Sequence, residues 1–195
     1  MSRLELLVVC ASLDEPPARR LVEDLGRRHL VDVATAAPAE AAAPRAELEV
    51  RRFALAPPAH AEPRGASFAG AFPAAMARAR ARGPWSPALL EFLHHEHSRY
   101  RAVVFLSYAS PLTVFGLPLV PERAILVPQA AGGADLADPP YVALFHLPRA
   151  IGYADERERD RVQVATRNEQ VPYELMRSAD ASAALDRLLA VALHG

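Results

Sequence analysis

Short apolar runs alternate along the chain with segments in which apolar residues recur at helical spacing. Residues 4–10 form a nearly uninterrupted apolar run with β-branched members, which is typical of a strand buried on both faces of a parallel sheet. Residues 18–28 carry a helical stripe, and residues 30–34 form a second apolar run. The three segments predict a βαβ unit of about 35 residues.

The same alternation continues to the end of the chain. Further strands are predicted at 48–55, 102–106, 125–127 and 149–153, and further helices at 68–82, from 86 or 87 to 98, at 155–164 and at 180–193. Residues 171–175 follow neither pattern and are predicted to be irregular. Regular alternation of strand and helix predicts an α/β fold, a single Rossmann-like, doubly wound parallel sheet of about six or seven strands with helices on both faces.

A length of 195 residues corresponds to one domain. We expect residues 1–178 to form this domain and residues 179–195 to form an amphipathic helix that packs on it. Leu185, Leu188, Leu189 and Ala192 recur at i, i+3, i+4 and i+7, which is the spacing of one buried helix face. Asp180 is the predicted N-cap of this helix.

Charge and cysteine content exclude several classes of function. The 22 basic and 23 acidic residues give a net charge of −1, so the chain lacks the one-signed field of nucleic-acid-binding proteins. The single Cys10 excludes an intrachain disulfide, and its place at the end of a buried strand predicts inert packing. No secretory signal and no apolar run of about 18–20 residues is present. We therefore expect a cytoplasmic protein without a transmembrane segment.

Ligands of doubly wound sheets bind outside the carboxyl ends of the strands. The candidate ligand-binding loops are therefore 11–16, 107–116 and 128–139. The first loop reads Ser-Leu-Asp-Glu-Pro-Pro from Ser12 and contains no glycine. Its two carboxylates would repel a pyrophosphate from the following helix. A dinucleotide-binding site is therefore disfavoured, and no Walker A sequence is present.

The loop after the strand at 102–106 is rich in hydroxyls. Ser107, Tyr108, Ser110 and Thr113 could bind a sugar or a nucleotide at the carboxyl end of this strand. Alternatively, these hydroxyls cap residues 111–115 as a short helix. The sequence leaves both interpretations open. A hydrolase is not predicted, because the glycines of a nucleophile elbow are missing.

Residues 94–97 read His-His-Glu-His, which are residue types that bind zinc. In a helix, however, His97 shares the apolar face with Leu93, whereas His95 points to the opposite face with Glu91. The three imidazoles therefore diverge. The sequence predicts a surface pair of Glu91 and His95 and a half-buried His97 rather than a metal site.

Four stretches resemble the N-terminal, acceptor-side domain of bacterial retaining glycosyltransferases with the GT-B fold. They read Gly-Pro-Trp-Ser-Pro-Ala-Leu-Leu-Glu-Phe-Leu at 83–93, Val-Phe-Leu-Ser-Tyr at 104–108, Gly-Leu-Pro-Leu-Val-Pro-Glu-Arg-Ala-Ile-Leu-Val-Pro at 116–128, and Leu-Phe-His-Leu-Pro-Arg-Ala-Ile-Gly-Tyr at 144–153. A helix with Glu158 follows them. The resemblance implies half of a GT-B enzyme, with a sugar or nucleotide-sugar ligand. It covers most of the chain, although the first 80 residues match only in pattern.

The chain departs from the pattern of this family at two motifs. Residues 12–15 replace the usual glycine-rich turn, and Ala-Ala-Gly-Gly at 130–133 replaces an Ala-His-Asp-Glu type motif. The donor-binding domain of a whole GT-B enzyme would need about as many residues again. Sugar transfer requires both substrates in one closed cleft, so we expect the isolated chain to be inactive, with no catalytic residue, metal ligand or cofactor.

The candidate substrate-binding residues are Ser12, Asp14, Ser107, Tyr108, Ser110, Gln129, Gly132, Gly133 and Glu158. Two functions remain open on these residues. The chain is a degenerate, glycosyltransferase-like module for binding or assembly, with another protein or a second copy of itself as partner, or it is the acceptor-binding half of an enzyme whose donor domain is a separate chain. In the second case it would help to transfer a hexose in surface polysaccharide synthesis. An unrelated α/β binding protein is a third, weaker alternative.

Overall fold

The apolar runs of the sequence form strands whose side chains are buried on both faces. In the computed structural model, which describes residues 3–36, 48–56, 71–129, 136–177 and 181–194, alternate residues of each central strand enter two separate cores. Leu7 and Val9 belong to one core, and Leu6 and Val8 belong to the other. This two-sided burial explains why the first strand carries no polar alternation.

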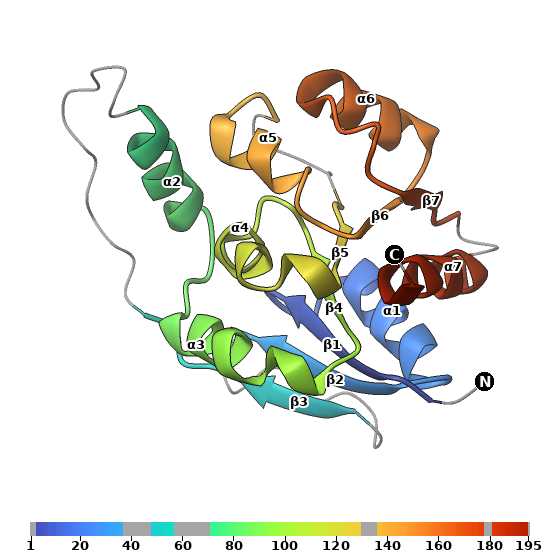
Figure 1. Ribbon diagram of the computed structural model, residues 1–195. Helices are drawn as coiled ribbons and strands as arrows, with labels where there is room; N and C mark the ends of the chain where they lie inside the picture. Colours follow the sequence, from blue (N-terminus) through green and yellow to red (C-terminus); the bar gives the residue numbers. More distant parts are fainter. Residues whose placement is uncertain (1–2, 37–47, 57–70, 130–135, 178–180, 195) are drawn as a thin grey trace.

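The described residues form one sheet of seven parallel strands (Figure 1). The strands are β1 (Glu5–Cys10), β2 (Leu30–Thr35), β3 (Glu49–Arg52), β4 (Ala102–Leu106), β5 (Ala124–Val127), β6 (Ala150–Tyr153) and β7 (Tyr173–Leu175). Their order is β3-β2-β1-β4-β5-β6-β7. The chain therefore moves outward from β1 to one edge and then returns to place β4 on the other side of β1, which creates a topological switch point between these two strands.

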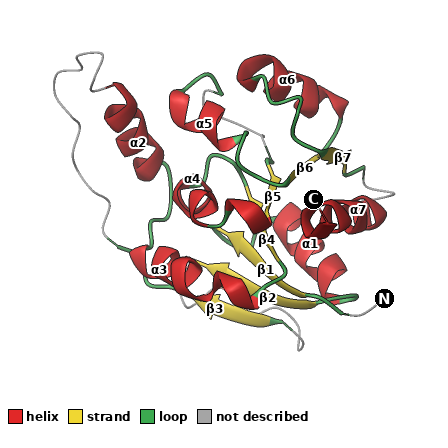
Figure 2. Cartoon of the chain, in the orientation of Figure 1, coloured by secondary structure: helices red, strands yellow, loops and turns green. Residues whose placement is uncertain are grey.

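Helices flank the sheet, as the red and yellow elements of Figure 2 show. They are α1 (Pro16–Gly26), α2 (Ala71–Ala81), α3 (Pro87–Glu96), α4 (Pro111–Gly116), α5 (Pro139–Leu144), α6 (Glu156–Thr166) and α7 (Ala181–His194). Helices α1 and α7 contribute to the same core, whereas α2 to α6 contribute to the core on the opposite face. The fold is thus the predicted Rossmann-like, doubly wound α/β fold.

Helix α7 packs on the sheet through the predicted stripe. Leu185 and Leu188 are fully buried, and Leu189 and Ala192 are nearly so. Asp186 pairs with Arg28 next to the end of α1. The predicted N-cap, Asp180, lies outside the described residues.

Several boundaries differ from the sequence prediction, for example that of β3, which ends at Arg52 rather than at residue 55. Residues 171–175, predicted to be irregular, contain β7, because Ile151 in β6 donates to the carbonyl of Pro172 and Met176 donates to that of Tyr153. Three residues at a sheet edge are too few to show a periodic pattern. Helix α1 begins at Pro16 rather than at residue 18. Proline is tolerated at this position because the N–H that it lacks would have no partner in the first helical turn.

Candidate functional site

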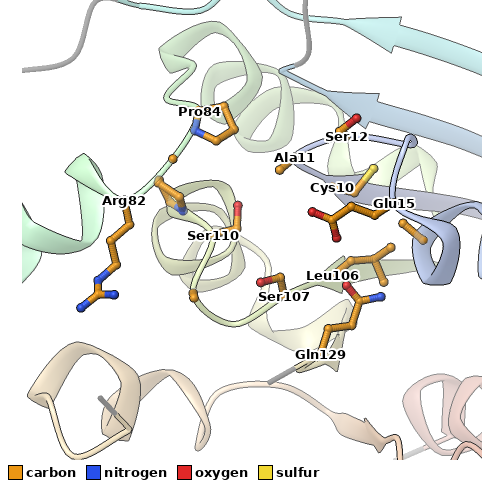
Figure 3. A pocket seen from close by; sticks show the side chains of 14 residues that line it. Cys10, Ala11, Ser12, Glu15, Arg82, Pro84, Leu106, Ser107, Ser110 and Gln129 are labelled. Atoms are coloured by element: carbon orange, nitrogen blue, oxygen red, sulfur yellow. The ribbon is translucent and has the colours of Figure 1, made fainter. Parts of the chain in front are cut away.

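A cavity of about 310 Å³ opens at the switch point between β1 and β4 (Figure 3). Three chain segments and one further residue line it. They are Cys10, Ala11, Ser12, Glu15 and Ala18 at the end of β1 and the start of α1, residues 82–84 between α2 and α3, Leu106, Ser107 and residues 109–111 at the end of β4, and Gln129 after β5. Its volume lies near the lower end of small-molecule sites. We call this cavity the crevice.

Ser107 and Gln129 enter the crevice from the ends of neighbouring strands. Both have left-handed backbones, with φ of 67° and 47°, a conformation that costs a residue with a side chain on the order of 1 kcal/mol or more. Hydrogen bonds between the two loops hold them, since Ser107 donates to Val127 and Tyr108 donates to Pro128 through their backbones. The described residues provide no hydrogen bond to either side chain. Their polar groups are therefore available to a ligand.

Other hydroxyls near the crevice stabilise local structure. Ser110 Oγ caps α4 by accepting from Leu112 N at 3.3 Å. Thr113 Oγ1 donates to the carbonyl of Leu106 at 3.3 Å. Ser12 Oγ donates to Asp14 Oδ2 and accepts from Asp14 N, both at 3.0 Å. The capping interpretation thus applies to Ser110 and not to Ser107.

The start of α1 lacks the features of a phosphate site. Pro16 and Pro17 occupy the first two positions of the helix and provide no N–H, and Arg19 N already donates to the carbonyl of Glu15. The Glu15 carboxylate extends into the crevice (Figure 3). A helix N-terminus binds an anion through exposed N–H groups and a positive dipole, so this arrangement disfavours a diphosphate.

Cys10 lines the crevice, but its thiol is unreactive. Burial, together with the Glu15 carboxylate, raises the pKa of its thiol to about 12. The thiol stays protonated at neutral pH and is a poor nucleophile. Cys10 therefore contributes packing at the floor of the crevice.

The structure brings four of the nine candidate residues to the crevice, namely Ser12, Ser107, Ser110 and Gln129. Gly132 and Gly133 lie outside the described residues. Asp14 binds Ser12, and Tyr108 is buried with its ring centroid 5.3 Å from that of Tyr141. Asp14 and Tyr108 therefore do not line the crevice.

Glu158 does not line the crevice and forms a variant of the capping box at the start of α6, in which its carboxylate accepts from the residue before the N-cap. Its Oε2 accepts from Ala154 N at 2.7 Å, and its own N–H donates to Asp155 at 2.8 Å. These reciprocal bonds fix the start of the helix. Helix α6 follows β6, and β5 lies between β6 and β4 in the sheet. Glu158 is therefore distant from the crevice, which lies at the ends of β1 and β4.

The histidine-rich end of α3 is a surface feature. His97 is half-buried, with Nδ1 2.9 Å from the carbonyl of Leu93 and Nε2 3.7 Å from Glu122. Glu91, His94 and His95 are exposed. Over the described residues, no three His, Cys, Asp or Glu side chains are placed to share a metal ion.

A second cavity of about 330 Å³ lies at the opposite end of the sheet, against the starts of β1, β2 and β3. Four of its five polar or charged side chains have partners, some of them outside the cavity lining. Tyr100 donates its hydroxyl proton to Asp32 Oδ2 at 2.7 Å, and Arg51 lies 2.8 Å from Glu49. Because these groups already have partners, the crevice is the better candidate site.

Glu15 and Arg82 line the crevice without having been predicted. The sequence identifies Glu15 only as a charge that repels phosphate. Arg82 stands directly before the helix break at Gly83-Pro84. This break is the sequence feature that could have indicated Arg82 as a site residue, because ligand-binding residues are often found on loops between regular elements.

Comparison with known proteins adds no family to this geometry. Neither the protein-family models nor the curated proteins give a match to the chain. Among the described helices, none combines the length and the apolar character that crossing a membrane requires.

Proposed function

We propose that this chain is a glycosyltransferase-like N-terminal domain that does not transfer sugar by itself and instead serves as a binding and assembly module. Its ligand is a hydroxyl-rich molecule of monosaccharide size, bound in the crevice. The observation that carries this proposal is the pair Ser107 and Gln129, whose side chains face the crevice without hydrogen bonds to the described residues.

The chemistry of these two residues suits a sugar. A serine hydroxyl both donates and accepts, and the glutamine amide adds two N–H donors and a carbonyl acceptor. Sugar hydroxyls also donate and accept, so the pair can satisfy adjacent hydroxyls of one ring. The Glu15 carboxylate adds an acceptor on another wall.

Catalysis by the chain alone is not expected. Transfer from a nucleotide sugar requires the diphosphate to be held in line with the acceptor. Pro16 and Pro17 remove the N–H donors that could hold it at α1, and Glu15 opposes its charge. A donor-binding surface would have to come from a partner, either a donor-domain polypeptide or a second copy of this chain.

An activity assay tests the first part of the proposal. The purified chain is incubated with glucose and a panel of nucleotide sugars, and the release of nucleoside diphosphate is measured. We expect no release above that of a buffer blank. Release by the chain alone that disappears in Ser107→Ala would contradict the proposal.

A second candidate is the acceptor-binding half of a two-chain hexosyltransferase. The Glu15 carboxylate favours it, because a carboxylate that reaches a bound hydroxyl can accept its proton during transfer. Adding a co-encoded donor-domain protein should then produce transfer that Glu15→Gln abolishes. Absence of transfer in the mixture would remove this candidate and leave the binding module.

A further inference from the structure

Strand β3 forms one edge of the sheet and has backbone groups that the described residues do not use (Figure 1). Phe53 N donates to the carbonyl of Thr35 in β2. Because successive residues of a strand direct their N–H and C=O groups to opposite sides, Glu49 and Arg51 also face β2, whereas Val50 faces outward. Neither backbone group of Val50 has a hydrogen bond within the described part of the chain. This edge can therefore accept a further strand.

The side chains on either side of Val50 carry opposite charges on one face of β3. Glu49 is 62% exposed and lies 2.8 Å from Arg51, which is 29% exposed. Charges at a sheet edge usually keep other chains away. A Glu-x-Arg order has the opposite effect on an antiparallel copy of itself, because each glutamate then lies opposite an arginine.

We propose that two copies of this chain pair antiparallel through β3, with the two-fold axis at Val50, and form one continuous sheet across a dimer. In this register Val50 exchanges both backbone hydrogen bonds with its own copy. Glu49 of each chain lies opposite Arg51 of the other, in the closer pairs with about 4.5 Å between Cα atoms, where opposite charges are favourable. The inference rests on the assembly role in the proposed function and is independent of the crevice ligand.

The charges select this register over its neighbours. An axis at Glu49, Arg51 or Arg52 would place a charged side chain directly opposite its own copy, which is destabilising. The other edge strand, β7, has Glu174 as its middle residue, and pairing centred there would oppose two glutamates. A second copy of this chain at β3 is therefore the partner that the charges of the sheet edges fit.

Analytical ultracentrifugation of the full chain over a micromolar concentration series tests the inference. We expect a reversible equilibrium between monomer and dimer. Glu49→Arg and Arg51→Glu should each weaken the dimer about ten-fold or more, because each places like charges opposite one another at two positions. Mixing the two variants should produce a heterodimer of wild-type affinity, since every cross-strand pair then joins opposite charges again.

Two further variants separate pairing from folding. Val50→Pro removes the outward N–H that the pairing uses, and proline is tolerated at such an edge position. It should weaken the dimer but keep the melting temperature of the wild-type monomer, measured at a concentration where the dimer is dissociated. Glu169→Arg makes the same charge change at an exposed position between α6 and β7 and should keep the wild-type dimer affinity.

A wild-type chain that stays monomeric throughout the series overturns the inference. A dimer that Glu49→Arg and Val50→Pro leave unchanged also overturns it, because assembly then uses another surface. If both charge variants are monomeric and their mixture forms no heterodimer, the register at Val50 is wrong.

Glucose titration of the wild type and of Glu49→Arg distinguishes this inference from the proposed function. Glucose should bind both proteins equally, because the crevice lies at the ends of β1 and β4 and not at β3. Dimerisation without glucose binding supports the inference and removes the crevice ligand. Glucose binding by a chain that remains monomeric supports the crevice ligand and overturns the inference.

Discussion

At the scale of single residues, the crevice combines backbone strain with unused hydrogen-bonding capacity. Besides Ser107 and Gln129, the left-handed non-glycine residues of the described chain include Arg167, which caps the end of α6. Arg167 is therefore a control that has the same backbone conformation in a purely structural position. Strain of this kind persists only where the surroundings enforce it, and it is frequent at ligand sites.

Glycine substitutions should separate strain from binding. We expect Ser107→Gly, Gln129→Gly and Arg167→Gly each to raise the free energy of unfolding by about 1 kcal/mol, because glycine adopts positive φ without a steric penalty. Only the first two should weaken glucose binding. Chemical denaturation and calorimetry provide the two measurements, and weaker binding in Arg167→Gly would argue against the assignment.

Cys10 should make stability depend on alkaline pH. Its pKa is about 12 in the folded chain and about 8.5 in an unfolded one. A raised folded pKa means that its contribution is fully present below pH ~8.5 and is lost as the pH rises through the folded value. Between pH 9 and 10, the free energy of unfolding should fall by up to about 1.4 kcal/mol per pH unit.

The matched variant for this pH dependence is Cys10→Ala, which has no thiol to ionise. Its unfolding free energy should change less between pH 9 and 10 than that of the wild type. Urea titrations at several pH values give the slope, and identical slopes for the two proteins would show that Cys10 is not the group responsible.

At the scale of elements, α7 completes one face of the sheet. Its leucines are buried in the same core as α1, and Asp186 lies 3.5 Å from His29 Nε2 in addition to its pair with Arg28. His29 is 4% exposed. The helix is thus attached both by apolar burial and by the ion pair between Asp186 and Arg28 after the end of α1.

Replacing one buried and one exposed residue of α7 tests how firmly it docks. Leu188→Ala should lower the free energy of unfolding by roughly 2–5 kcal/mol, because it leaves a cavity at a fully buried position. Val191→Ala, at a position that is 37% exposed, should change it by about 0.5 kcal/mol. Thermal and urea unfolding measure both.

A truncated chain distinguishes closure of the fold from assembly through α7. Ending the chain at residue 178 should lower the melting temperature and expose surface that binds an apolar dye. A truncated protein that melts like the full chain but changes its oligomeric state would instead assign α7 to assembly.

Strands buried on both faces and striped helices were predictable from local pattern, which is why β1, β4 and α7 are found close to where the sequence placed them. Strand β7 was not, because its formation depends on pairing with β6, a contact between segments distant in sequence. The crevice loops at the ends of β1, β4 and β5 followed from topology, whereas the segment 82–84 between α2 and α3 did not.

The roles of individual residues within those loops required coordinates. Ser107 and Ser110 both line the crevice, yet only Ser110 caps α4. Ser110 directly precedes Pro111, which marks a helix start, whereas nothing in the sequence indicates the left-handed backbone of Ser107. The contribution of Arg82 likewise depends on where the end of α2 comes to lie.

At the scale of the whole molecule, the two ends of the sheet differ in their unused polar groups. At the carboxyl ends of β4 and β5, Ser107 and Gln129 remain available, whereas at the amino ends Tyr100 and Asp32 bind one another. Ligand binding in doubly wound sheets occurs at the carboxyl ends. We propose that this chain binds a sugar in the crevice at the switch point.

Amide NMR during titration of the labelled chain with glucose and glucuronate tests that claim most directly. We expect saturable chemical-shift changes concentrated at Ser107, Ala109 and Gln129, with Arg167 and the cavity around Tyr100 unaffected. Saturable changes centred on Tyr100 and Asp32, or no saturable change with either sugar, would contradict the claim.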